Sequence, residues 1–351
     1  MMIESVKNEF NGYFIEKGYS IRESKGLKAE NPNLLFNISG GVVFEDYIEG
    51  NKIDPMKVAS IQKCLRTDSW DKIGFSGKHH LFFEMIGHFS FGVADEYDTK
   101  YYFIEDSIGF LLRIDNSIKE KIYLTVHPDD DVSGDVIRFF DLDYVENKNN
   151  ITLSPQRTRS GYRVEIIYKN NQREIELWNL VFTQYADPFL KKPIEKIIAD
   201  SGMSIERLLS VTEEKNNNYE CSEWLEYINI LDCKEFVSRE HLYKMADLLR
   251  TAIELFKENI LPGKKVENYV SRKILRELFT LLIFYKLDVD IVISRTPFSD
   301  EFKKEYEAFK KSLERGAQII DRLKKGKGFL SPRDKELLRG SYGYPDMLIS
   351  R

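Results

Sequence analysis

The spacing of apolar residues changes from a strand-like to a helical pattern at about residue 204 of this chain of 351 residues. Between Leu34 and Val181, short runs rich in Phe, Ile, Val and Tyr are separated by glycine, asparagine and proline, which is typical of strands with irregular connections. After residue 204 the spacing becomes helical, and three ranges are long enough for a helical bundle: Leu242–Ile260, Val266–Tyr285 and Glu301–Leu323. The pattern predicts an α+β fold, a mostly antiparallel sheet flanked by helices and followed by an all-helical part.

Two domains are expected from the length and composition. With 42% hydrophobic and 31% charged residues, a chain of this size buries a sizeable core and commonly divides in two. A first helix is expected over Ile3–Lys17, where apolar residues recur at helical spacing. We place the sheet domain at residues 1–232 and the helical domain at residues 233–351.

The sequence predicts a cytoplasmic protein. Its start has no basic segment followed by an apolar run, and the longest apolar stretch, Leu278–Tyr285, is too short to span a bilayer. The cysteines Cys64, Cys221 and Cys233 lack metal-ligand spacing and cannot all pair within one chain, which favours a reducing compartment. No membrane association is expected.

The net charge of −5 is unevenly distributed. From Cys233 onward there are 25 Lys and Arg against 18 Asp and Glu, so this part carries +7 and the first 232 residues carry −12. Such a balance permits contact with a polyanion, although lysine clusters are more often solvated surface.

Two separated blocks indicate a nucleotide site. Gln62–Arg66 ends a predicted strand and leads to Lys78–Gly92, which carries aromatic residues on the returning strand, and Asp200–Leu208 places a second arginine at the start of a distant helix. With Leu34–Asp46 and Ile175–Gln184, these blocks occur in the order found in alanyl-tRNA synthetases. The chain therefore resembles that class II aminoacyl-tRNA synthetase family from about residue 3 to residue 345. Long combined motifs are more specific than a lone glycine loop.

The resemblance implies a site for ATP. Forming an aminoacyl adenylate needs positive charge on the α-phosphate and on the departing pyrophosphate. By resemblance, the two catalytic residues are Arg66, which holds the α-phosphate and the amino acid's carboxylate, and Arg207, which holds the γ-phosphate. Phe82, separated from Lys78 by three residues, is expected to carry the adenine. Phe82 and Phe83 point to opposite faces of a strand, so only one of them can line the pocket.

The same resemblance assigns the remaining ligands. Glu176 is expected to hold the nucleotide and its Mg²⁺, a hard cation that prefers oxygen. The residues expected to bind the amino acid are Asn179, Val181, Asp200 and Gly202, with Asp200 paired to the α-ammonium group. His79 and His80 either orient phosphate oxygens or belong to a hydrogen-bonded scaffold.

The chain departs from the family pattern in several places. Thr152 takes the position of a pocket tryptophan, which enlarges the pocket or makes it more polar. At positions with which the family reads the acceptor stem of alanine tRNA, this chain has Val266, Glu277 and Gly340. The chain ends before the family's editing domain and C-terminal module, so neither proofreading nor zinc is expected.

The preferred function is ATP-dependent activation of alanine or another small amino acid, with transfer to an acceptor other than standard alanine tRNA: a carrier, a small molecule or an atypical tRNA. Two alternatives remain open. One is a minimal alanine-tRNA ligase without editing, and the other is a non-catalytic binding or regulatory protein that keeps the nucleotide pocket.

Overall fold

The computed structural model describes residues 3–231, 237–325 and 328–349. They form two compact units. The first contains the described residues up to Thr67 together with Phe83–Glu223, and the second contains Asp68–Phe82 together with those from Trp224 onward. The predicted domain boundary at residue 232 lies outside the described residues.

In the described part of the first unit, nine strands form one sheet in the order β1-β2-β3-β9-β8-β7-β4-β5, with β6 paired to β7. The central pairings β3–β9, β9–β8, β8–β7 and β7–β4 are antiparallel, whereas β1–β2 and β4–β5 are parallel. The expected mostly antiparallel sheet is confirmed. The strands are β1 Ser20–Arg22, β2 Met56–Leu65, β3 Phe82–Phe91, β4 Ile122–Val126, β5 Tyr144–Glu146, β6 Ile151–Leu153, β7 Ser160–Lys169, β8 Glu174–Tyr185 and β9 Pro193–Ser204.

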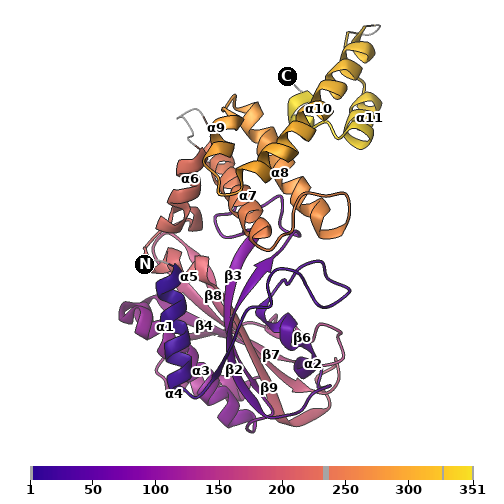
Figure 1. Ribbon diagram of the computed structural model, residues 1–351. Helices are drawn as coiled ribbons and strands as arrows, with labels where there is room; N and C mark the ends of the chain where they lie inside the picture. The colour runs from indigo at the N-terminus through magenta and orange to yellow at the C-terminus, as the bar shows by residue number, and fades with distance from the viewer. Residues whose placement is uncertain (1–2, 232–236, 326–327, 350–351) are drawn as a thin grey trace. The chain divides into compact units, whose positions relative to one another are not determined.

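Helices α1 and α3 cover one face of this sheet (Figure 1). Phe14 of α1 and Phe103 of α3 both pack on the buried ring of His88 from β3, with ring centroids 4.7 and 3.8 Å away. Helix α3 was not predicted from the sequence. The helices of this unit are α1 Ile3–Glu16, α2 Glu45–Ile48, α3 Glu96–Ile114, α4 Asp131–Phe139 and α5 Ile205–Thr212.

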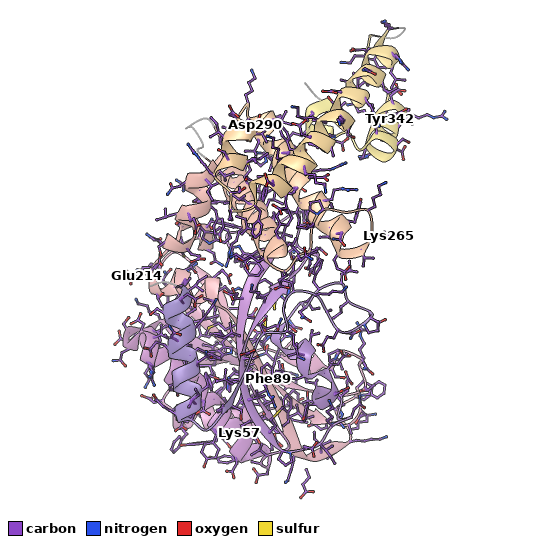
Figure 2. All side chains as sticks on the ribbon, in the orientation of Figure 1. Lys57, Phe89, Glu214, Lys265, Asp290 and Tyr342 are labelled. Carbon is purple, nitrogen blue, oxygen red and sulfur yellow. The ribbon has the colours of Figure 1, made fainter. Side chains whose placement is uncertain are left out.

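The opposite face of the sheet is covered by the short 3₁₀ helix η1, Gly40–Phe44, and by α2. Phe44 and Ile48 pack there against Phe89 and Phe91 of β3. Phe89 is fully buried and lies in the interior of the first unit (Figure 2). These contacts hold the η1–α2 segment over the strands that carry most of the predicted site.

The described part of the second unit is helical apart from the connection between β2 and β3. That connection is held by Asp247 of α7, which accepts hydrogen bonds from the His80 ring (2.9 Å) and the Leu81 backbone N–H (3.0 Å). The three predicted long helices are confirmed within a few residues. The helices are α6 Leu225–Leu231, α7 Arg239–Lys257, α8 Val266–Phe284, α9 Val289–Ser294, α10 Ser299–Lys324, α11 Pro332–Tyr342 and α12 Asp346–Ile349. None of the helices described is both long and apolar enough to cross a membrane.

Candidate functional site

One face of three neighbouring strands carries the residues predicted to bind an amino acid. Phe89 of β3 pairs with Asp200 of β9, and Asp200 pairs in turn with Val181 of β8. Two residues away, Gly202 pairs with Asn179. Because directly paired residues project to the same side of a sheet, all four predicted residues share the face that carries Phe89.

Arg66 follows β2 directly and reaches the same region. Its Nε donates to the carbonyl oxygen of Ile38 at 2.7 Å, and its guanidinium carbon lies 5.1 Å from the centre of the Phe83 ring. Phe83 precedes Phe89 by an even number of residues on β3, so the two side chains project to the same face. The sheet therefore carries an arginine and an aromatic ring on the face to which Asp200 also projects.

Phe82, expected to carry the adenine, points to the other face of the strand. Strand alternation turns its ring away from Phe83, and the side chain is only 2% exposed. The Arg250 guanidinium carbon lies 4.8 Å from the ring centre, so Phe82 packs in the interior of the second unit. The ring on the site face is Phe83.

A β-bulge in β8 determines where Glu176 points. The pairing of β7 with β8 shifts by one residue, so that Leu177 has no partner of its own. In a regular strand, residues three positions apart project to opposite faces. The extra residue cancels this difference and returns Glu176 to the face of Asn179.

Arg207 lies in the first turn of α5, which Ser204 caps by accepting from the Arg207 backbone N–H. Its guanidinium donates to the Glu176 backbone carbonyl at 2.7 Å and lies 3.9 Å from a carboxylate oxygen of the same residue. Burial lowers the pKa of the Arg207 guanidinium. The positive charge of Arg66 also lowers this pKa, whereas the negative charge of Glu176 raises it. Two guanidinium groups that repel each other in this way provide a favourable position for an anion.

A cavity of about 650 Å³ adjoins Arg66, since Ile38 both accepts the Arg66 hydrogen bond and lines the cavity. Among the predicted residues, Val181 and Asp200 line it, whereas Asn179 and Gly202 do not. Its other polar and small lining residues are Asn31, Asn33, Ser39, Gly41, Glu45, Thr152, Ser154, Gln156 and Thr183.

The carboxylate of Asp200 faces this cavity without a partner. A Cβ on Gly41 of η1 would lie 3.8 Å from its Oδ1, which shows how closely the backbone passes. No hydrogen bond or ion pair to its side chain occurs in the described ranges. Burial raises the pKa of Asp200 to about 7. A cationic ligand would stabilise the ionised form.

Sequence reasoning overlooked two residues of this site, Met85 and Thr183, and favoured Phe82 over Phe83 for the adenine. Phe83 follows His79 by the same spacing that relates Phe82 to Lys78, so this signal was available. Met85 sits over Gly202, where a Cβ would lie 2.8 Å from its sulfur. Thr183 lines the cavity two residues beyond Val181.

Glu176 can offer a carboxylate as a metal ligand beside Arg207. Its side chain is 43% exposed, so its carboxylate can bind a cation whose other ligands come from phosphates. Within the described residues, no group of three or more His, Cys, Asp or Glu side chains is arranged to hold a metal ion.

The His80 side chain is held by contacts within the second unit. Its ring stacks on Trp224 with centroids 5.0 Å apart and bonds the buried Asp247. These contacts support the scaffold interpretation of this histidine. His79 is bonded to Ser76 within the same connection.

A second cavity, of about 600 Å³, lies within the helical unit and contains several cations, but the main ones are paired. Lys244 lies 2.5 Å from Glu277, which also accepts from the Trp70 indole N–H. Arg276 lies 2.7 Å from Glu305. The surface is therefore less attractive to phosphate than its content of basic residues indicates.

Comparison with known proteins identifies the family of this chain. The family described as tRNA synthetases class II (A) matches residues 5–294, and the chain belongs to this family. Alanine–tRNA ligase of Campylobacter jejuni strain RM1221 is 27% identical over 97% of this chain and 46% of its own length. That of Ruthia magnifica is 28% identical over 92% of this chain and 41% of its own length.

The chain thus spans less than half the length of these curated relatives. Among solved structures, the apo histidyl-tRNA synthetase of Staphylococcus aureus covers 62% of this chain and 67% of its own, at 13% identity and a TM-score of 0.44. A pyrrolysyl-tRNA synthetase of Desulfitobacterium hafniense covers 62% and 70%, at 12% identity and a TM-score of 0.39.

Proposed function

We propose that this protein activates a small amino acid with ATP to form an aminoacyl adenylate. The observation that carries the proposal is the combination of two neighbouring guanidinium groups, Arg66 and Arg207, with the unpartnered Asp200 carboxylate in an adjoining cavity. Cations beside an anion-binding position suit a triphosphate, and an isolated carboxylate suits an α-ammonium group.

The proposed reaction is in-line displacement at the α-phosphorus. An oxygen of the amino acid's carboxylate forms a bond to the α-phosphorus, and the bond to the oxygen that bridges to the β-phosphate breaks. Pyrophosphate leaves with the electron pair of that bond. Arg66 holds the carboxylate and the α-phosphate, and Arg207 holds the γ-phosphate, so both reduce the charge that builds up at the reacting groups.

We assign the remaining roles by position. Phe83, not Phe82, stacks with the adenine, because its ring lies beside Arg66. Asp200 binds the α-ammonium group, while Asn179, Val181 and Gly202 form the adjoining face. Glu176 would hold Mg²⁺, which, when bound together with ATP, neutralises part of the phosphate charge.

Exchange of labelled pyrophosphate into ATP, measured with each amino acid in turn, tests this function. We expect exchange with at least one small amino acid and its loss on chelation of Mg²⁺. Binding of ATP or an amino acid without exchange would instead support the non-catalytic alternative. Calorimetry on the same preparation separates the two.

For the acceptor, we propose a molecule other than standard alanine tRNA. Glu277 lies within the second unit beside Lys244 and Trp70, so a carboxylate occupies this surface and is fixed there. A carboxylate would repel phosphate groups of an RNA stem. A carrier, a small molecule or an atypical tRNA remains the proposed acceptor.

The second candidate is a conventional alanine-tRNA ligase. The +7 charge of the part from residue 233 onward and the similarity to alanine–tRNA ligases support it. Attachment of labelled alanine to alanine tRNA by the purified protein would establish this candidate. Adenylate formation without attachment would leave the first proposal in place.

A further inference from the structure

Three hydroxyl groups line the 650 Å³ cavity without hydrogen-bond partners. They belong to Ser39 at the start of η1, Thr152 on β6 and Thr183 on β8. Throughout the described ranges, no hydrogen bond to any of these three side chains is found. Thr183 is buried, whereas Ser39 and Thr152 are partly exposed. A polar group buried without a partner is unfavourable unless a ligand or water satisfies it.

Of the three residues, Thr183 gives the clearest indication that an unpaired hydroxyl faces the cavity. It is 1% exposed, and its backbone is paired on both sides, with Gly161 of β7 and Ile198 of β9. Alternation along β8 places its side chain on the face of Val181, and hence beside Asp200. The hydroxyl therefore lies in the cavity wall close to the carboxylate expected to bind the ammonium group.

The charges that line the cavity disfavour a charged side chain on the bound amino acid. Asp200 and Glu45 are the charged lining residues, and both are acids, so an acidic ligand side chain would be repelled. Glu45 already accepts hydrogen bonds from the amides of Asn31 (2.7 Å) and Gln156 (3.2 Å). Because these hydrogen bonds already occupy the Glu45 carboxylate, it would bind an ammonium group on the ligand's side chain more weakly than a free carboxylate would.

We propose that the cavity selects a small amino acid with a hydroxyl on its side chain, of which serine is the smallest, over alanine. This inference rests on the proposed function, because it requires that Asp200 hold the α-ammonium group. A hydroxyl both donates and accepts, and thus can pair with any of the three free hydroxyls. A site built to hydrogen-bond a substrate hydroxyl rejects the analogue that lacks it much more strongly than an apolar pocket rejects an added group.

Pyrophosphate exchange with serine, threonine, alanine, glycine and 2,3-diaminopropionate tests the inference. For the unaltered protein we expect a kcat/KM for serine at least ~10²-fold above that for alanine. Thr183→Val, nearly equal in volume, should lower the serine value by about tenfold or more and leave the alanine value almost unchanged. Thr183→Ser keeps the hydroxyl and should retain the preference. Thr99→Val, a buried threonine of α3 outside the cavity, is the matched control.

Equilibrium dialysis with labelled serine and alanine provides a readout that does not require turnover. If exchange fails with every amino acid, the proposed function fails, while tighter binding of serine than alanine would still support the inference. Equal or tighter binding of alanine overturns it, as does a best exchange rate with alanine or with 2,3-diaminopropionate. An equal loss for both substrates in Thr183→Val also overturns it.

Discussion

The guanidinium carbon of Arg66 lies 5.1 Å from the centre of the Phe83 ring, and the two residues lie just after the end of β2 and near the start of β3. A cation beside an aromatic face offers a phosphate contact and a base contact within the length of one nucleotide. This pair gives the sharpest tests of the proposed site.

Replacing Arg66 by lysine should lower pyrophosphate exchange by roughly 10²-fold. Lysine keeps the charge but cannot hold two oxygens at once as the planar guanidinium does. Arg138→Lys, at an exposed arginine paired with Asp135, is the control and should retain normal exchange. An Arg66→Lys protein with unimpaired exchange would remove Arg66 from the proposed chemistry.

Phe83 and Phe82 should respond differently to replacement by leucine. Loss of base stacking in Phe83→Leu is expected to raise the KM for ATP by about tenfold, because stacking on an aromatic residue is worth roughly 1–3 kcal/mol. Phe82→Leu should instead lower the Tm, since its ring packs against Arg250. A larger effect on the KM for ATP from Phe82→Leu would return the adenine platform to Phe82.

Amino-acid binding should weaken at low pH because of Asp200. Its pKa is about 7 in the free protein, so the carboxylate is mostly protonated below pH 7 and charged above it. Since the α-ammonium group binds the charged form, the Kd should rise by about tenfold for each pH unit below 7 and level off above it. Titration calorimetry from pH 5.5 to 8.5 measures this. Asp200→Asn should bind weakly, and its affinity should not follow this titration.

Asp200 should also make the free protein less stable at high pH. For an acid whose pKa is higher in the folded than in the unfolded state, the folded state holds an extra proton between the two pKa values, so stability falls as pH rises through this window. Asp200→Asn should therefore have a higher Tm than the unaltered protein at pH 8, with a smaller difference at pH 5. A thermal shift series that shows no pH-dependent gap between the two proteins would contradict the burial of this carboxylate.

Much of the fold could be predicted because long amphipathic helices carry a strong local signal. The predicted range Val266–Tyr285 differs from α8 by one residue at its end. Helix α3 was overlooked because Glu96–Ile114 is rich in Tyr, Phe and Ile, residues that favour strands when only local preference is considered. Its burial against the sheet overrides that preference.

The candidate site could be predicted only in part, since motifs identify residues but not the faces to which they point. The choice between Phe82 and Phe83 depends on the register of β3 against β9, which a local pattern does not contain. Similarly, Asp68–Phe82 belongs to the helical unit through contacts with residues far along the chain, such as Asp247.

Because of the bulge at Leu177, the number of residues in the neighbouring strand β7 determines which way the Glu176 side chain points. One additional residue in β7 opposite Leu177 would restore regular pairing and turn the Glu176 carboxylate through the sheet, away from Arg207, although no ligand-binding side chain had changed. When related chains are compared, an insertion in β7 should therefore count against the magnesium role even where the glutamate itself is retained.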